Sequence, residues 1–311
     1  VRDAFRPNWS ALFRMLVSAN PQRKEKKADT WTPSVSADVS YLDDRSKNWI
    51  VWLGHACYLM QFNGLRFLTD PQLRDMPFVP RRVYPPFSYE EIRGVDYLLL
   101  SHDHRDHTDE KCVRAIVKNN PIRKILCPLK LSNVISSWVG DCPIEEAGWY
   151  QQFDLEDTGL KITFLPSQHW CRRGLLDFNR VLWGSFMLEV GADAGAGEGT
   201  RARTVYFGGD SAATDYWSEI GQLFPNIDLC MLGIGAYSPD FMMRDVHANP
   251  EEAFAGYRDL GATYWWPMHH GTYYLSNEPA REPLRRATAS MEKAGLEDRL
   301  VQPMINERWW F

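Results

Sequence analysis

The sequence predicts an α/β fold in which helices cover a sheet. Short apolar runs that read as buried strands alternate with segments of helical pattern, as expected for helices packed on a sheet. The Asn63-Gly64 pair between two of these runs is the strongest short hairpin signal. With 311 residues, the chain can bury a full core as one large domain or as two packed halves.

Composition and charge exclude several classes of function. A formal charge of -5 argues against a nucleic-acid-binding protein, which needs a basic stripe to neutralise phosphates. The six cysteines show no Cys-x-x-Cys spacing, so neither a thiolate zinc site nor a redox pair is expected. We expect the cysteines to be free, buried thiols. No apolar run is long enough to span a bilayer, which indicates a soluble or peripherally membrane-associated protein. Because the chain begins at Val1, removal of a leader peptide and the compartment both stay open.

Residues 1–48 predict an N-terminal extension that packs on a domain spanning residues 49–311. Within it, residues 8–17 predict a short amphipathic helix, for which packing on the domain is favoured over insertion into a lipid interface. The charged run Arg23–Lys27 predicts a solvated loop.

From Trp49 onward the pattern changes to strands and helices. Period-two or continuous apolar runs predict strands at residues 49–53, 57–62, 65–69, 97–100, 124–127, 144–146, 161–165, 184–190, 204–207, 229–234 and 263–266. Helical patterns occupy residues 110–118, 130–138 and 249–257. The third of these has Asn249 as its cap and Pro250 at its first position. Two loops stand out, a proline-rich one at residues 77–86 and a Gly-Ala-rich one at residues 191–200.

The strand at residues 97–100 ends in a loop that is built to hold metal. His102, His104, Asp106 and His107 follow it within six positions. Imidazole and carboxylate are the ligands that zinc and its neighbours accept, and solvated loops rarely gather three histidines. This loop therefore predicts a metal centre.

Four later residues complete the predicted centre. His169, Asp210, His247 and His269 each sit at a strand end or in a connecting loop, as the first cluster does. Loops on one rim of a sheet can converge on a single site. Each of these histidines alone would have a structural interpretation, but a centre that needs more ligands makes them candidates.

The His102-x-His104-x-Asp106-His107 motif, followed by the later His, Asp and His in this order, resembles the metallo-β-lactamase superfamily. Finer motifs narrow the resemblance to the N-acyl-phosphatidylethanolamine-hydrolysing phospholipase D family and its bacterial relatives. They include Trp52-Leu-Gly-His-Ala56, Ser167-Gln-His-Trp-Cys171 and His269-x-Gly-Thr272. The likeness covers about residues 49–280, and both ends match only loosely.

This resemblance implies an αββα four-layer sandwich with two Zn²⁺ ions, or other divalent transition metals, at the edges of the sheets. By the motif positions, His102, His104 and His169 hold one ion, while Asp106, His107 and His269 hold the other. Asp210 bridges the two ions. The resemblance also makes Asp70 a residue that orients the ligand loop, and His247 an active-site residue that is not a ligand.

Such a centre lowers the pKa of a shared water, so a metal-bridging hydroxide can attack a phosphodiester whose charge the ions neutralise. Asp210 and His247 are the predicted catalytic residues, the latter hydrogen-bonding a phosphate oxygen or protonating the leaving alkoxide. His55, Trp170 and Tyr237 are weaker candidates for substrate contact, each with a structural role as the alternative.

The prediction is a dinuclear zinc phosphodiesterase of the phospholipase D type that hydrolyses N-acyl-phosphatidylethanolamine or a related glycerophospholipid. A phospholipid or another small phosphodiester is the expected partner, with peripheral membrane contact as an option and no nucleic acid. A lactonase acting on a sugar-phosphate lactone and a metal-binding protein without turnover are the two alternatives. Metal identity, acyl-chain preference and oligomeric state stay open.

Overall fold

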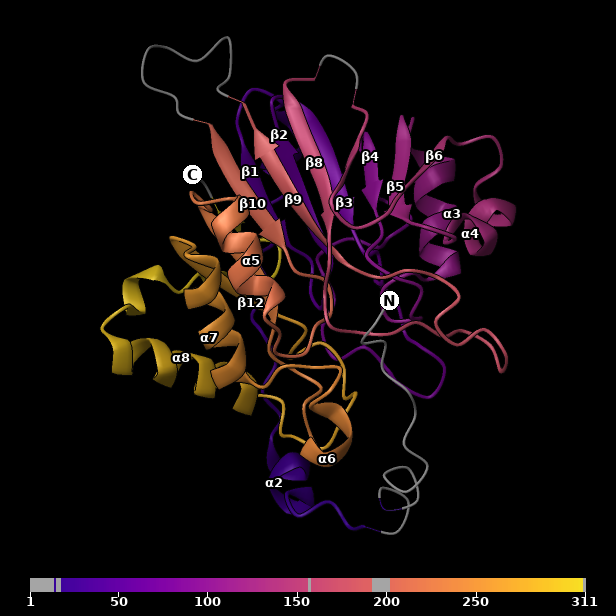
Figure 1. Cartoon of the computed structure of the whole chain (residues 1–311). Coiled ribbons are helices and arrows are strands. Elements are labelled where there is room, and N and C mark those ends of the chain that lie inside the picture. Colours follow the sequence, from indigo (N-terminus) through magenta and orange to yellow (C-terminus); the bar gives the residue numbers. More distant parts are fainter. Residues whose placement is uncertain (1–13, 15–17, 156–157, 192–201, 310–311) are drawn as a thin grey trace.

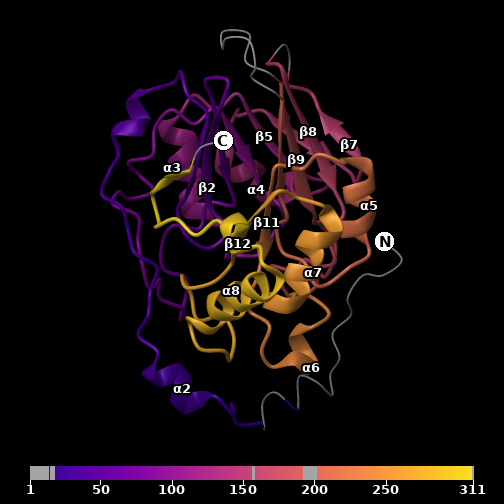
Figure 2. The same cartoon turned by 90° about the vertical axis from the view of Figure 1, so that its left-hand side faces the viewer.

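Two mixed β-sheets pack face to face, and helices cover both outer faces (Figure 1). The computed structural model describes residues 14, 18–155, 158–191 and 202–309. Helices α3 and α4 lie against the first sheet, and α5, α7 and α8 lie on the opposite side of the molecule, against the second sheet (Figures 1 and 2). The predicted αββα sandwich is confirmed.

The first sheet has seven strands and is antiparallel at one end and parallel at the other. In spatial order its strands are β13 (Arg308–Trp309), β1 (Trp49–Trp52), β2 (Tyr58–Phe62), β3 (Leu65–Thr69), β4 (Tyr97–Leu99), β5 (Lys124–Pro128) and β6 (Ile144–Ala147). Strands β3 to β6 run parallel, so their carboxyl ends reach the same edge. The Asn63-Gly64 turn joins β2 and β3 as predicted.

The second sheet has six strands. In spatial order they are β12 (Tyr264–Met268), β11 (Leu229–Gly233), β10 (Arg203–Phe207), β9 (Ser185–Val190), β8 (Leu160–Leu165) and β7 (Gln151–Phe153). Strands β10, β11 and β12 are parallel, and the remaining pairs are antiparallel. The carboxyl ends of β10 and β12 therefore lie at one edge of this sheet.

The helices end and begin at recognisable signals. Their bounds are α2 (Arg23–Ala28), α3 (Glu110–Asn119), α4 (Ser132–Val139), α5 (Tyr216–Leu223), α6 (Asp240–Met243), α7 (Pro250–Leu260) and α8 (Glu282–Ala294). Asp109 caps α3 by accepting from the Cys112 backbone N–H. Asn249 and Glu252 form a reciprocal capping box at the start of α7. The sequence predicts Asn249 as the cap, but not the part that Glu252 plays.

Apolar side chains form three core layers, one between each pair of adjacent layers of the four-layer structure. Strand β4 shows the arrangement, because Tyr97 and Leu99 face the second sheet while Leu98 and Leu100 face the layer of α3 and α4. A strand buried on both faces reads as a continuous apolar run, which is why the sequence identifies it. The third core lies between the second sheet and helices α5, α7 and α8.

Two features of the N-terminal region need comment. The prediction of a solvated loop for the charged run Arg23–Lys27 is wrong. This run forms most of α2, a helix without buried residues. Its residues are good helix formers, with Glu25 in the first turn and Lys26 and Lys27 in the last, where they complement the helix dipole. The amphipathic helix predicted at residues 8–17 and most of the loop at 191–200 lie outside the described residues.

Residues 18–48 run along the body of the chain. Asn20 Nδ2 donates to Asn277 O at 2.9 Å, and the Ser36 N–H donates to Ile305 O at 2.8 Å. We propose, as the sequence predicts, that the segment before Trp49 is an extension of one domain. None of the helices described combines the length and the apolar character needed to cross a bilayer. All six cysteines are free, and only Cys142 is not buried.

Candidate metal centre

The predicted ligands come together at the edge where the carboxyl ends of the strands meet. The loop from Ser101 to His107 follows β4, Asp210 follows β10, and His269 follows β12. His169 follows β8, and His247 lies between α6 and α7. Parallel strands of both sheets thus deliver polar loops to one place, as the sequence analysis expects.

A first group of three nitrogen atoms is formed by His102, His104 and His169. His104 Nδ1 lies 3.0 Å from His102 Nε2 and 3.2 Å from His169 Nε2. Burial lowers the pKa of His104 to about 4, and it holds the pKa values of the other two well below their ordinary value. All three imidazoles are therefore neutral, which is the state that coordinates a metal.

A second group is formed around Asp106. Its Oδ2 atom lies 3.6 Å from His107 Nε2, 3.6 Å from His269 Nε2 and 3.2 Å from His55 Nε2. A carboxylate and imidazoles at this separation are a plausible set of zinc ligands on chemical grounds. The two histidines that the sequence assigns to this group are both in it.

Asp210 stands between the two groups. Its Oδ2 atom lies 3.1 Å from His107 Nε2 and 3.2 Å from His269 Nε2 in the second group. The same oxygen lies 3.7 Å from His169 Nε2 and 3.9 Å from His102 Nε2 in the first. One carboxylate oxygen therefore lies near nitrogen atoms of both groups.

The electrostatics favour positive charge at this position. Burial would raise the pKa of the Asp210 carboxyl, but His107 and His269 outweigh it and keep that pKa well below its ordinary value. Conversely, burial would lower the pKa of His269, but Asp210 and Asp106 raise it to about 9. A cation coordinated here would replace the imidazole protons, because metal ligands bind in their deprotonated form.

Buried polar atoms without hydrogen-bond partners test whether the residues fit metal ions. In the part of the chain that the structure describes, His107 Nε2, His269 Nε2 and Asp210 Oδ1 are buried and lack such a partner. Leaving a buried polar atom unsatisfied costs about 1–3 kcal/mol, so these atoms indicate a missing binding partner. Coordination of cations by this nitrogen and oxygen donor set would satisfy them.

Outer hydrogen bonds orient the candidate ligands. Asp70 Oδ2 lies 2.8 Å from His107 Nδ1, while its two oxygens accept from the Ser101 hydroxyl and backbone N–H. His169 Nδ1 lies 2.8 Å from Val246 O. When each Nδ1 carries the proton, the Nε2 atom is unprotonated, and its lone pair faces the centre. Asp70 thus joins His107 to Ser101, in a backbone conformation with a φ of 33°.

His55 lies deeper than a substrate contact requires. The residue is only 1% exposed, and its ring centroid is 4.0 Å from that of His269. Its backbone N–H donates to Thr272 Oγ1, which fixes its loop against the one that carries His269. The structure therefore places His55 against Asp106, in the second ligand group, instead of on an open wall.

The other predicted active-site residues divide into two sets. His247 Nδ1 lies 3.8 Å from Asp210 Oδ2, and its side chain remains 14% exposed, so it faces both the centre and the solvent. Trp170 packs edge-on against His104 with ring centroids 4.8 Å apart. Tyr237 is not brought to the centre by any contact described, since its hydroxyl donates to Glu282 and its ring lies under Arg286.

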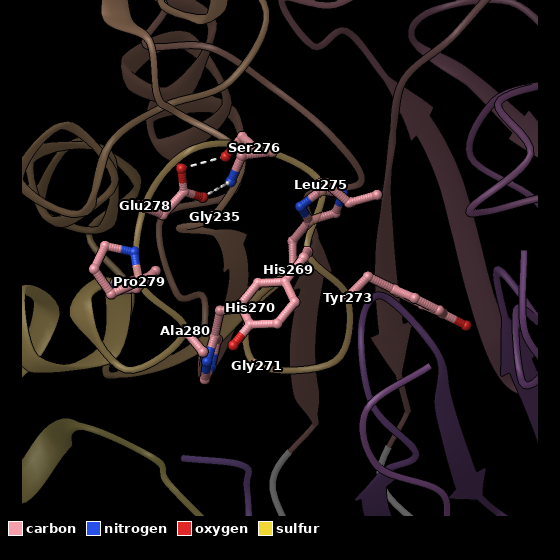
Figure 3. A pocket seen from close by; sticks show the side chains of 13 residues that line it. Gly235, His269, His270, Gly271, Tyr273, Leu275, Ser276, Glu278, Pro279 and Ala280 are labelled. Carbon is pink, nitrogen blue, oxygen red and sulfur yellow. Dashed lines mark hydrogen bonds between the residues drawn. The ribbon is translucent and has the colours of Figure 1, made fainter. Parts of the chain in front are cut away.

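His270, next to the candidate ligand His269, points elsewhere. Its ring packs near those of Trp31 and Trp52. Figure 3 shows a cavity that is lined in part by His269 and His270. In it, Glu278 accepts hydrogen bonds from Ser276 and from the Ala236 backbone N–H. The cavity volume of about 20 Å³ suits about one water molecule and excludes a substrate.

Two supporting residues were missed by sequence reasoning. Ser101 links Asp70 to the ligand loop, and its place directly after the apolar strand was a usable signal. Arg81 is 4% exposed and donates to the carbonyls of Leu53, Gln72 and Val83, tying the proline-rich loop to the rest of the centre. Nothing in its local sequence distinguishes Arg81 from Arg74 and Arg82, which are only partly buried.

Comparison with known proteins agrees with this geometry. A family model described as a beta-lactamase superfamily domain matches residues 65–270. The chain belongs to the metallo-β-lactamase superfamily. It is a metal-dependent hydrolase of that superfamily, and the fold predicted from the resemblance is the one observed.

Named relatives lie within this superfamily. The chain is 30% identical over 285 residues to an N-acyl-phosphatidylethanolamine-hydrolyzing phospholipase D 1 of Caenorhabditis elegans, covering 86% of this chain and 77% of the relative. It is 29% identical to the mitochondrial N-acyl-phosphatidylethanolamine-hydrolyzing phospholipase D of Saccharomyces cerevisiae, covering 82% of this chain and 54% of that protein. Among solved structures, an isothiocyanate hydrolase from Delia radicum gut bacteria superposes with a TM-score of 0.65 at 20% identity, covering 85% of this chain and 98% of that one. This last likeness concerns the fold.

Proposed function

We propose that this protein is a dinuclear metal phosphodiesterase of the phospholipase D type, acting on N-acyl-phosphatidylethanolamine or a related glycerophospholipid. The observation that carries the proposal is the position of Asp210 Oδ2 between two groups of ligand atoms. The names of the Caenorhabditis and Saccharomyces relatives support the lipid substrate.

Each ligand group is assigned to a different metal ion. We assign His102, His104 and His169 to one zinc ion, Asp106, His107 and His269 to a second, and Asp210 to both. Two divalent ions bound there supply activated water at neutral pH and neutralise charge on a phosphoryl group. Asp210 fixes the separation of the two positions, and Asp70 holds His107 so that its Nε2 atom faces inward.

His247 is the residue that we assign to the substrate phosphate. Its imidazole lies beside Asp210 and is open to solvent on one side, so a phosphodiester at the centre would lie within hydrogen-bond reach of it. Trp170, half-buried beside His104, would form an apolar wall next to the reacting group. In this assignment His247 positions a phosphate oxygen or the leaving oxygen.

The experiment compares three substrates on purified, zinc-loaded protein. We expect hydrolysis of bis-(p-nitrophenyl) phosphate and release of the N-acyl amino alcohol from N-acyl-phosphatidylethanolamine, with no turnover of a generic lactone. Asp210→Asn is the inactive control. Turnover of the lactone alone would contradict the phosphodiesterase proposal and favour the lactonase, and hydrolysis of none of the three would favour a metal-binding protein.

A further inference from the structure

Three large apolar side chains stand almost fully in solvent. Among the residues that the structure describes, Phe78 is 104% exposed, Leu175 is 85% exposed and Leu176 is 86% exposed, whereas the next, Leu223, is 55% exposed. Covering such a side chain removes apolar surface from water, which is favourable. Three of them at loop tips indicate a surface that is covered in use. We call Phe78, Leu175 and Leu176 the rim side chains.

The two loops that carry the rim side chains both contact the metal-binding loop. From the first, Gln72 Nε2 donates to Arg105 O at 3.0 Å. From Arg105, Nη2 donates to Arg173 O in the second loop at 3.4 Å. Arg173 in turn donates to Thr108 O at 2.7 Å. The loop at residues 171–180, pink at the lower right of Figure 1, therefore contacts the metal-binding loop at Arg105, as Gln72 does.

An apolar path leads from the second loop to the candidate metal ligands. The ring of Phe178, two residues after Leu176, lies 5.2 Å from that of Trp170. Trp170 then packs on His104 at 4.8 Å. Aromatic side chains at these separations are in contact. A molecule held at the rim side chains is therefore close to the opening of the centre.

The charge of these loops differs from that of the chain as a whole. Residues 171–180 carry three arginines against one aspartate. Residues 71–84 also carry three arginines against one aspartate, but Arg81 is buried and Arg74 pairs with Asp109. The whole chain has a formal charge of -5. Arg105 and Arg180 are exposed near the rim side chains. Exposed arginines near an anionic lipid surface strengthen binding to it.

We propose that the rim side chains insert into an anionic phospholipid surface and hold the opening of the metal centre against it. Apolar tips enter the boundary between headgroups and acyl chains, while the neighbouring arginines face lipid phosphates. This docking is independent of turnover, because none of the rim side chains belongs to the ligand groups. A substrate that resides in the same surface would reach Trp170 without first entering water.

Flotation with vesicles of phosphatidylcholine, with and without phosphatidylglycerol, tests the proposal on the full chain. We expect the wild-type protein to float with anionic vesicles, and Leu175→Ser/Leu176→Ser and Phe78→Ser each to bind at least about 10-fold more weakly. Leu223→Ser is the matched control, because it removes an exposed leucine from α5, away from the centre, and should bind as the wild type does.

Two further measurements keep docking and catalysis apart. Hydrolysis of soluble bis-(p-nitrophenyl) phosphate should be unchanged in the rim variants, which also shows that they are folded. Vesicle binding by the rim variants equal to that of the wild type would overturn the docking proposal. So would size-exclusion chromatography in which the wild type is a dimer that the double variant dissociates, without vesicle binding by either. Rim-dependent flotation of a protein that hydrolyses no phosphodiester would support docking and refute the proposed function.

Discussion

One carboxylate oxygen, Asp210 Oδ2, lies within 3.9 Å of nitrogen atoms from five histidines that come from four separate loops of the chain. Such convergence exceeds what the structure of a folded core requires, since every buried charge costs free energy unless it is paired. The arrangement is explained when the carboxylate and imidazoles share cations.

His247 should matter for turnover and not for metal content. Replacing it by Gln keeps a hydrogen-bonding side chain but removes the imidazole, and we expect turnover of a phosphodiester to fall by about 10²-fold. Metal content, measured by elemental analysis of the purified variant, should equal that of the wild type. Unaltered turnover would remove His247 from the mechanism, and loss of metal would make it a ligand.

His55 gives the opposite expectation. Because its Nε2 atom lies 3.2 Å from Asp106 Oδ2, we expect His55→Asn to weaken binding of metal at the second ligand group by about 10–100-fold. Titration with zinc under a competing chelator measures this. Asp141→Asn, a substitution of an exposed carboxylate in the turn after α4, serves as control. An increase in KM with unchanged metal affinity would instead support the substrate contact that the sequence suggests.

At the scale of elements, the predictions were strongest where a local pattern sets the structure. The strand before the ligand loop is apolar on both faces, and helix α7 has Asn249 and Pro250 at its start. Helix α2 was mistaken for a loop because its six charged or small residues bury nothing and so lack an apolar stripe. Helix α8, with a proline near its start and Gly295 after its end, carried signals that were not used.

Close packing between α5 and α7 predicts that replacing a glycine of α7 by alanine destabilises the fold, although alanine is the better helix former. Gly256 lies on α7, where an added Cβ atom would come within 2.2 Å of the Trp217 ring on α5. Helix propensity alone would make Gly256→Ala stabilising by about 1 kcal/mol. Overpacking costs about 1–3 kcal/mol, so we expect a net loss of free energy of unfolding, measured by denaturant titration.

A gain in stability for Gly256→Ala would contradict the close packing of these helices. Ala255→Gly on the exposed face of α7 is the control, since only propensity acts there, and it should lower the free energy of unfolding by about 1 kcal/mol.

At the scale of the whole molecule, the sequence predicts the layers through the resemblance and the ligands through their motif spacing. It does not predict which long-range contacts support them. The hydrogen bonds of Arg81 with Leu53 and Gln72, and the packing of His55 on His269, join segments far apart in sequence. Local patterns contain no information on such pairs, so Arg81 was missed, and the sequence left open whether His55 contacts substrate or has a structural role.

Removal of metal should destabilise the entire fold. The ligand groups join loops from both sheets, so cations that bind only the folded chain stabilise it by mass action. We expect chelation to lower the free energy of unfolding by about 3–4 kcal/mol for each bound ion, relative to protein in zinc at 100–1,000 times its dissociation constant. Thermal unfolding with chelator and with added zinc measures this, and identical melting curves would show that no structural metal is bound.

The central claim is that two cations share Asp210. Anomalous diffraction at the zinc absorption edge, on crystals of the zinc-loaded chain, measures their number and position directly. We predict two peaks about 3.5–4 Å apart on either side of Asp210, one beside His102, His104 and His169, and one beside Asp106, His107 and His269. A single peak, or peaks away from these side chains, would contradict the account.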